Sequence, residues 1–400
     1  ATNKTAQTDT KSKTDKTETT KPTVKKPVPK IESQSSLYNG IYNQGATCYI
    51  NSSIQTLFFI PYFRDVVYHI TSSKEGSMVS ELQYLFYNLE RGKTHCSTVK
   101  LTKSLKMSSR SVHIQQDIQE FLLSFIEKVQ SAVKNDPNLK DTISYVFEGE
   151  IAHNIKTESG AFITSNKETF KQLMVSVSSS IETSLRKYFL PEKIDDYIVD
   201  ENTPQPVTLD SKIVKLPRVL QIVIKRYKQG EITNTNVKDD SKVIFKEDLD
   251  LQPYYESTNK NECTKYILFS VIVHSGTVSF GHYSVYLKPE MGNEWFYFSD
   301  TIVRKSTPKE AIETNYGGNN YSTNKTSRST YGKSAYLLFY IRIDSIQEMF
   351  FKNIQMPKNL LTFVEKELKK ESLVKKSDPS FLIDIQVFNE LCLIENCKEK

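Results

Sequence analysis

A chain of 400 residues is long enough for one large domain or two smaller ones, so its length excludes very little. Its composition, with 38% hydrophobic and 25% charged residues, 22 tyrosines and 21 phenylalanines, excludes a wholly disordered chain and is typical of a soluble globular protein. The formal net charge of +6 has its lysine excess mainly in the first thirty residues, so we interpret it as a property of a tail and not of a nucleic-acid surface.

Targeting and membrane signals are not seen in the sequence. No run of about twenty apolar residues is present, and the N-terminus has no apolar h-region, which predicts neither a membrane span nor a secretory signal. Five cysteines, an odd number without a CxxC pair, argue against a disulfide framework and a zinc ribbon. These features predict a protein of the cytoplasm, the nucleus or both. Because the chain begins at Ala1, we expect a processed form or a fragment of a longer protein.

Residues 1 to about 36 consist mainly of Thr, Lys, Pro and Ser, with almost no large apolar side chains. Such a segment cannot bury enough surface to offset the entropy lost on ordering, so we predict a disordered tail. The glycines within residues 40–45 then predict a loop that leads into Cys48. Apolar residues at helical spacing predict a buried helix that begins near Cys48 and ends before Pro61.

The rest of the chain alternates between helical and β patterns. Apolar residues at helical spacing predict a helix over residues 114–133, with polar residues near its N-terminal turn. Residues 145 to about 240 mix polar stretches with β-like runs such as Tyr145–Ile151, which predicts an extended, irregular β-region. A helical pattern follows Ile343 through about Val374, and Phe381–Val387 predicts one further strand. Short runs of β-branched and aromatic residues predict the strands of an antiparallel sheet at Val219–Tyr227, Tyr266–Val273, His282–Leu287, Glu294–Phe298 and Tyr336–Ile343.

Cys48 has the position expected of a nucleophilic thiol. At a helix start, after a glycine-containing turn, the helix dipole and free backbone N–H groups stabilise a thiolate. The alternative is a small buried hydrophobic cysteine, the usual role of a lone Cys. We assign that alternative to Cys96, Cys263, Cys392 and Cys397.

A thiolate nucleophile needs a base, and the sequence offers six histidines. His282 follows Gly281 and opens a β-run, so its imidazole would lie at a strand start with room for a peptide beside it. From spacing alone, a surface or core histidine is an equally acceptable interpretation.

Several segments, in chain order, resemble the ubiquitin-specific protease family. Residues 40–52 around Cys48 resemble the family's cysteine box, and residues 274–286 around His282 resemble its histidine box. The resemblance extends over roughly residues 37–343 and also includes Gln116–Phe121, Leu216–Leu220, Lys225–Tyr227 and Asn315–Gly318.

This resemblance implies an α+β fold of the papain-like cysteine protease type. A helical thumb would comprise residues 37 to about 144, and an antiparallel β palm with β fingers would comprise about 145–345. A charged helical extension would follow over residues 346–400, leading into a further module.

The resemblance also implies a deubiquitinating enzyme, a thiol-dependent hydrolase that cuts the (iso)peptide bond after the C-terminal glycine of ubiquitin. Cys48 would then be the nucleophile, His282 the base and Asn43 a hydrogen-bond donor to the oxyanion. Without the family match, Asn43 would be interpreted as a turn residue. The implied partners are ubiquitin and ubiquitinated proteins, and we expect a monomer that binds neither nucleic acid nor a membrane.

Further positions match those that grip the extended, arginine-bearing tail of ubiquitin in the family. Asp117 and Glu120 match acidic positions suited to charge-assisted hydrogen bonds, although carboxylates in a first helical turn also stabilise the helix itself. Tyr227, His274 and Tyr283 are expected at the substrate site, where the two tyrosines would either line the tail channel or simply pack in the palm.

The third member of the catalytic triad departs from the family pattern. Family members usually carry Asp or Asn at the position matched by Ser299, followed by an Asp matched by Asp300. A serine orients His282 less strongly than a carboxylate does, so we expect activity at a reduced rate. Either side chain or a water would hold the imidazole. Phe280 is expected to alter the loop that covers the tail.

No metal and no cofactor are predicted. Many relatives hold zinc in paired cysteine motifs in the fingers, and no such pair occurs between residues 145 and 245. Thiolate attack, acyl-enzyme formation and hydrolysis use only side chains and water. Two other functions stay open: a catalytically weak ubiquitin-binding family member that acts as a scaffold, and a nucleic-acid binder working through the basic tail. That tail lacks arginine and aromatic residues for contacts with bases, which disfavours the second.

Overall fold

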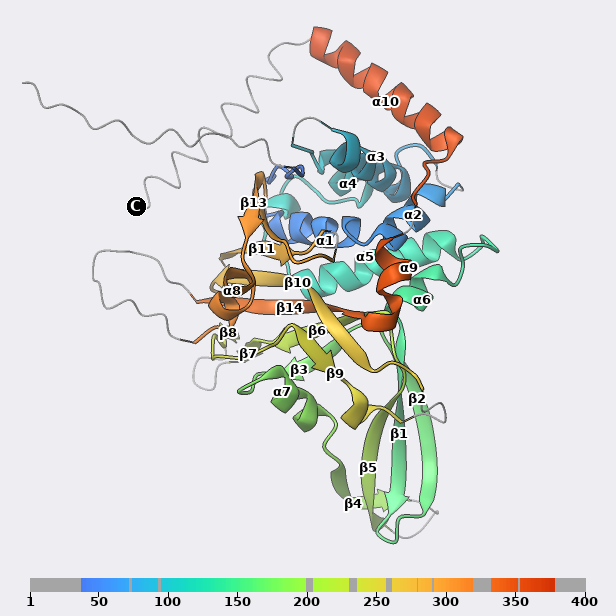
Figure 1. Ribbon diagram of the computed structural model, residues 1–400, viewed down its shortest axis with the longest axis vertical. Helices are drawn as coiled ribbons and strands as arrows, with labels where there is room; N and C mark the ends of the chain where they lie inside the picture. Colours follow the sequence, from blue (N-terminus) through green and yellow to red (C-terminus); the bar gives the residue numbers. More distant parts are fainter. Residues whose placement is uncertain are drawn as a thin grey trace, which may run out of the picture. The chain divides into compact units, whose positions relative to one another are not determined.

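The computed structural model describes residues 37–377, apart from 72–73, 93–94, 199–203, 230–235, 257–260, 279, 290, 319–331 and 352 (Figure 1). The predicted tail, residues 1–36, and the predicted strand Phe381–Val387 lie outside the described residues. Of the helices in this described part, none is long and apolar enough to cross a membrane.

Helices make up the first part of the described chain and confirm both helices expected there. The helix expected near Cys48 is α1. The helix expected over 114–133 begins at Ile118, because Asp117 accepts a hydrogen bond from the Gln119 N–H and forms its N-cap. The elements of this part are α1 (Cys48–Phe58), α2 (Pro61–His69), α3 (Met78–Arg91), α4 (Val99–Ser104), η1 (Ser111–His113), α5 (Ile118–Val133) and α6 (Thr142–Phe147).

The β-like run predicted at Tyr145–Ile151 is wrong in its first half. Its first three residues belong to α6, because Ile143, Val146 and Phe147 together bury one face of this short helix. The first strand starts only at Gly149.

An eight-stranded sheet forms the centre of the β-region, in the order β13-β12-β11-β10-β14-β6-β3, with β9 pairing with β10 outside this path. The strands of the predicted antiparallel sheet pair with one another as antiparallel neighbours, and a further strand, β3, which was not predicted, runs parallel to β6. A long connection through α7 (Ile181–Tyr188), β4 and β5 makes this parallel pairing possible. The strands are β3 (Leu173–Ser176), β6 (Val219–Lys225), β9 (Asp248–Asp250), β10 (Lys265–Gly276), β11 (Gly281–Leu287), β12 (Trp295–Ser299), β13 (Ile302–Ser306) and β14 (Lys333–Arg342).

Two smaller sheets complete the β-region and confirm its irregular character over residues 145–240. A four-stranded sheet has the order β2-β1-β5-β4 and extends from the large sheet on the side away from α1–α4 (Figure 1). A two-stranded sheet pairs β7 with β8. The strands of these two sheets are β1 (Gly149–Thr157), β2 (Phe162–Phe170), β4 (Glu192–Ile198), β5 (Pro204–Lys215), β7 (Tyr227–Gln229) and β8 (Asn236–Lys238). Three short helices lie between other strands: η2 (Gln252–Tyr254), α8 (Pro308–Ala311) and η3 (Glu313–Asn315).

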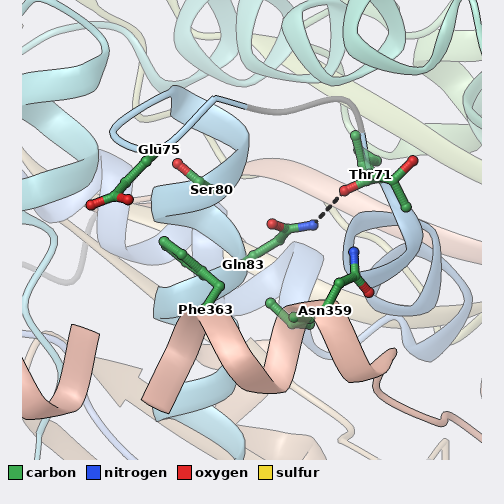
Figure 2. A pocket seen from close by; sticks show the side chains of 8 residues that line it. Thr71, Glu75, Ser80, Gln83, Asn359 and Phe363 are labelled. Atoms are coloured by element: carbon green, nitrogen blue, oxygen red, sulfur yellow. Dashed lines mark hydrogen bonds between the residues drawn. The ribbon is translucent and has the colours of Figure 1, made fainter. Parts of the chain in front are cut away.

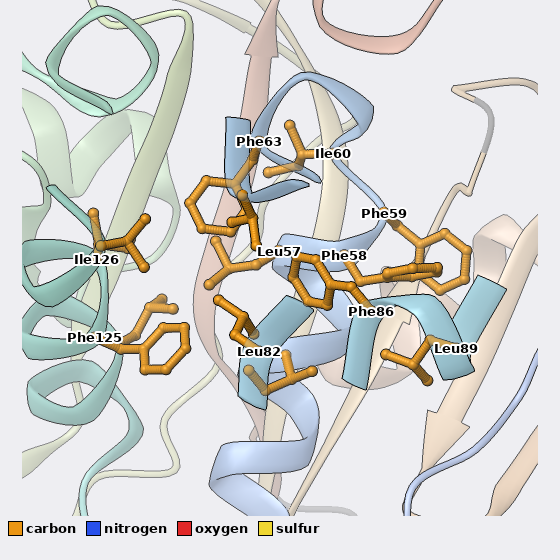
Figure 3. Close-up of a cluster of buried hydrophobic side chains, with 14 of the residues drawn as sticks. Leu57, Phe58, Phe59, Ile60, Phe63, Leu82, Phe86, Leu89, Phe125 and Ile126 are labelled. Carbon is orange, nitrogen blue, oxygen red and sulfur yellow. The ribbon is translucent and has the colours of Figure 1, made fainter. Parts of the chain in front are cut away.

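The core is divided between the two faces of the large sheet. One buried cluster joins the helices to one sheet face and includes Phe58, Phe63, Phe86 and Phe125 (Figure 3). The other cluster lies mainly between strands and α7. Every residue of α1 is buried, so this helix is the centre of the first cluster and has no solvent-facing side.

The helical pattern predicted after Ile343 through about Val374 is confirmed, with one interruption between two helices. A short turn η4 (Ile343–Ser345) and α9 (Ile346–Phe350) are followed by non-helical residues, and α10 (Lys358–Ser377) begins after Pro357. The residue before a proline is disfavoured in the helical region, which separates the two helices. A cavity of about 240 Å³ between α3 and α10 is lined by Ser80, Gln83, Asn359 and Phe363, among others (Figure 2).

We expect Phe86→Ala to lower the free energy of unfolding by about 3–5 kcal/mol, because the ring lies fully buried in the helix-side cluster and leaves a cavity there. Urea unfolding followed by tryptophan fluorescence would measure the shift. Phe351→Ala, at a side chain that is 59% exposed, is the matched control and should change little. Equal shifts in both variants would contradict this account of the core.

Candidate active site

Cys48 is the first residue of α1 and lies against strand β11. Its side chain is 2% exposed, and its Sγ accepts a hydrogen bond from the Tyr283 backbone N–H at 3.4 Å. Burial raises the pKa of the Cys48 thiol to about 11, the Asp300 charge adds to this, and the Tyr283 N–H opposes it. The predicted helix start is confirmed, but removal from water outweighs the stabilisation of a thiolate there. At neutral pH the resting group is therefore a thiol.

His282 and Ser299 meet at the adjoining ends of β11 and β12. Their Nε2 and Oγ atoms lie 2.8 Å apart, within hydrogen-bonding distance. The other ring nitrogen, Nδ1, lies 4.0 Å from Oδ2 of Asp300. Within the described part of the chain, no hydrogen bond joins this imidazole to Cys48, although the residue after His282 contacts the sulfur directly.

Asp300 fixes the loop before α1. Its Oδ2 accepts a hydrogen bond from Asn43 Nδ2 at 3.0 Å, and its Oδ1 accepts one from Asn51 Nδ2 at 2.7 Å. Its backbone φ of 52° is left-handed, as the tight turn between β12 and β13 requires. Asn51 was not predicted as a site residue. The signal for it was its place three residues after Cys48, about one helical turn along a fully buried helix.

Asn43 forms the turn that leads into α1. Its Oδ1 accepts hydrogen bonds from the backbone N–H groups of Gly45 at 2.9 Å and Thr47 at 3.0 Å. The interpretation of Asn43 as a turn residue is thus confirmed, and the same turn points its amide nitrogen at Asp300.

A second polar cluster lies beside the first, between α5 and the large sheet. The Tyr227 hydroxyl lies 3.3 Å from both His274 Nδ1 and the Tyr283 hydroxyl. Burial, followed by the charges of Lys238 and His282, lowers the pKa of His274 to about 3, so this imidazole is neutral.

The two predicted acidic positions differ in their surroundings. Asp117 caps α5 and also accepts a hydrogen bond from the Tyr336 hydroxyl at 2.6 Å, so the helix-stabilising interpretation is confirmed for it. Glu120 lies one turn later and is exposed to solvent.

Other candidate chemistry lies elsewhere. Cys96 is buried, which raises its pKa to about 12, and Cys263 is half-buried, while Cys392 and Cys397 lie outside the described residues. Among the described residues, no group of three or more His, Cys, Asp or Glu side chains could hold a metal ion. Neither of two cavities, of about 240 and about 400 Å³, is lined by site residues.

Cys48 at the start of the buried helix α1 and His282 at the start of the adjacent strand β11, in an α+β fold, have the arrangement of the papain-like cysteine protease fold. The model of the ubiquitin carboxyl-terminal hydrolase family matches residues 39–340, and this chain belongs to that family.

Curated relatives carry the same family name. Ubiquitin C-terminal hydrolase 12 of Arabidopsis thaliana is 32% identical, over 84% of this chain and 32% of its own length. Ubiquitin carboxyl-terminal hydrolase 7 of Drosophila melanogaster is 33% identical, over 76% of this chain and 27% of its own length. Ubiquitin carboxyl-terminal hydrolase 15 of Schizosaccharomyces pombe is 33% identical, over 76% and 28%. The matched region is therefore about a third or less of each of these proteins.

We expect Asp300→Asn to lower the pKa of Cys48, because the carboxylate charge disfavours a thiolate nearby. The pH profile of Cys48 alkylation by iodoacetamide, followed by mass spectrometry of its peptide, should shift to lower pH. Burial stays the largest influence, so the pKa should remain above that of a solvated thiol. Asp248→Asn, at an exposed carboxylate on β9, is the control. An unchanged profile in Asp300→Asn would contradict the assigned influence of this charge.

Proposed function

We propose that this chain is a deubiquitinating cysteine protease that hydrolyses the (iso)peptide bond after the C-terminal glycine of ubiquitin. The observation that carries the proposal is the convergence of Cys48, His282 and Ser299, in which the strand that bears the histidine contacts the thiol. The names of the relatives supply the substrate, since all three are ubiquitin hydrolases.

In the proposed reaction, Cys48 transfers its proton to His282 and attacks the carbonyl carbon of the terminal glycine. The tetrahedral intermediate collapses to a thioester as the imidazolium gives its proton to the departing lysine amine. Water, deprotonated by the same imidazole, then releases the ubiquitin carboxylate and restores the thiol. Because no hydrogen bond joins Cys48 to His282 in the described part of the chain, we propose that substrate binding brings the thiol and the imidazole together.

Asn43 is proposed to stabilise the oxyanion. A side-chain amide has two N–H donors, and the hydrogen bond to Asp300 uses one of them. Asp300 is thus proposed to orient Asn43 rather than the catalytic imidazole. The other donor would serve the oxyanion.

Ser299 is proposed as the residue that orients His282. Its Oγ lies 2.8 Å from Nε2, which leaves Nδ1 on the side of the ring that faces Asp300 and is available to the thiol. A neutral hydroxyl stabilises an imidazolium less than a carboxylate does, so we propose a slower enzyme than relatives with Asp or Asn at this place.

The second polar cluster is proposed to line the channel for the ubiquitin tail. Glu120 is exposed to solvent and could pair with an arginine of the ubiquitin tail. Asp117 would contact the tail while it still caps α5. Tyr227, His274 and Tyr283 would form the wall of the channel.

The motif segments support two finer proposals. The first is that, within its family, the chain most resembles the herpesvirus-associated ubiquitin-specific protease. The second is that α1–α6 form the thumb, the large sheet the palm and the four-stranded sheet the fingers. Its monomeric state and its place in the cytoplasm or nucleus stay predictions.

A ubiquitin C-terminal fluorogenic amide and a thiol-reactive ubiquitin probe test the proposal. We expect the wild type to turn over the amide and to be labelled, and Cys48→Ala to lose both. Ser299→Ala should lower kcat at least about tenfold, because the base is then no longer oriented.

Cys96→Ala and Ser306→Ala are the matched controls and should retain turnover and labelling. The raised pKa of Cys48 and the serine at the third position favour one alternative function, a ubiquitin-binding scaffold. Ubiquitin binding by the wild type without turnover or labelling would establish that alternative and refute the protease.

A further inference from the structure

Lys238, the last residue of β8, has a buried ammonium group. Its side chain is 3% exposed and pairs with Asp240 Oδ1 at 2.8 Å. Its Nζ also donates to the backbone carbonyls of Gly332 at 2.6 Å, His274 at 3.1 Å and Gly276 at 3.4 Å. The three donors of one ammonium thus face four oxygen atoms from three segments of the chain.

Such burial is costly, since an ion loses several kcal/mol of hydration when it leaves water. Burial accordingly lowers the pKa of Lys238, while the Asp240 carboxylate acts in the opposite direction. A lysine is retained in such a place only where its hydrogen bonds and its countercharge offset that cost.

Two of the three carbonyls that Lys238 holds, those of His274 and Gly276, belong to the base of the loop that precedes His282. His274 and Gly276 end strand β10, and Gly276 pairs with Gly281 across the loop. A Cβ on Gly281 would lie 2.2 Å from His274 Nε2, so the loop's far end lies directly against the side chain of a residue that Lys238 anchors. His282 is the next residue.

The first end of the loop is also held by the sheet, since Gly276 pairs with Gly281 of β11 and Ser275 with Lys333 of β14. Gly276 has a φ of 119°, and hydrogen bonds within the described part of the loop join Thr277 to Phe280, whose side chain is 81% exposed. The Phe280 side chain therefore does not fix this segment by hydrophobic packing, and the ammonium adds to the backbone contacts that do.

We propose that Lys238 is a positioning residue for catalysis, which holds the loop base so that the imidazole of His282 reaches the thiol in the orientation that proton transfer needs. This role rests on the proposed protease function. Displacement of a catalytic group by about 1 Å costs about 10²-fold in rate, so loss of the anchor should act on kcat. Binding of ubiquitin, which involves a much larger surface, should change far less.

Lys238→Met keeps the side-chain length and removes the charge and the donors. We expect kcat on the ubiquitin amide to fall between about tenfold and about 10²-fold, with KM within about threefold of wild type. Hydrogen exchange at the amides of residues 275–282 should accelerate, while exchange in the central strands β10 and β14 stays unchanged.

Lys288→Met is the matched control. Lys288 lies just beyond the other end of β11, its side chain is also 3% exposed, and it pairs with one carboxylate, Glu247. Among the described residues, no hydrogen bond or ion pair joins the Lys288 side chain to the loop, so its replacement should leave kcat and loop exchange unchanged. An equal fall of kcat in both variants would assign the effect to general destabilisation and overturn the proposal.

Lys238→Arg keeps the charge and the donors. We expect its kcat and its loop exchange to lie closer to those of the wild type than those of Lys238→Met do. If Lys238→Met does not fold, comparison of Lys238→Arg with the wild type still tests the proposal. The Arg variant keeps the hydrogen-bond donors, so its loop should exchange at the wild-type rate only if those donors hold the loop. Identical behaviour of the Arg and Met variants, or a Met variant with wild-type kcat and exchange, would refute the role.

Failure of this proposal differs visibly from failure of the proposed function. Without protease activity the wild type would not turn over the amide at all, and the exchange measurements would still show whether Lys238 holds the loop. With protease activity, a normal kcat in Lys238→Met leaves the enzyme established and removes only the positioning role.

Discussion

One carboxylate holds the catalytic segments together. Helix α1 is buried on every side, so its polar side chains must find partners inside the protein. Asn51 does so through Asp300 Oδ1, and Asn43 donates to the other oxygen of the same group. The start of the helix with Cys48, the loop before it and the turn after Ser299 are thereby fixed to one another. Side chains far apart in sequence acquire a common geometry because a buried amide requires an acceptor.

The same burial opposes reactivity. Removal from water and, less strongly, the charge of Asp300 that organises the site raise the pKa of Cys48 to about 11. Proton transfer from such a thiol to an imidazole is unfavourable at rest, and the neutral hydroxyl of Ser299 does little to stabilise an imidazolium. A site with these properties needs energy from substrate binding to become an ion pair, and the proposed substrate, ubiquitin, would offer a large surface from which to draw it. Burial of the thiol would then be the common cause of slow turnover and of a strict dependence on ubiquitin.

Periodicity predicted α1, α5 and strands such as β6, β10 and β14, because apolar spacing records which face of a helix or strand is buried. It did not single out α2, α3, α4 or α7. It failed at Tyr145–Ile151, where the apolar residues 145–147 are compatible with a strand and with a short helix, and packing against α5, β6 and α2 decides. The candidate catalytic residues were predicted from motifs that carry chemistry. Asn51 and Lys238 were not, since an amide in a helix and one lysine among many are ordinary in sequence. Their importance arises from partners more than thirty residues away.

Two buried cations explain how the segments beside the site keep their shape with so little apolar content. Arg226 donates to the carbonyls of Ala335, Asp239 and Ser241, and Lys238 donates to carbonyls of the loop base. These carbonyls are backbone atoms, and the one side-chain partner given for Lys238, Asp240, lies outside the loop before His282, so the anchoring needs no side chain of that loop. An exposed residue such as Phe280 can then change without release of the base beneath it. The proposed anchoring through the backbone would let the exposed Phe280 vary independently of the placement of His282.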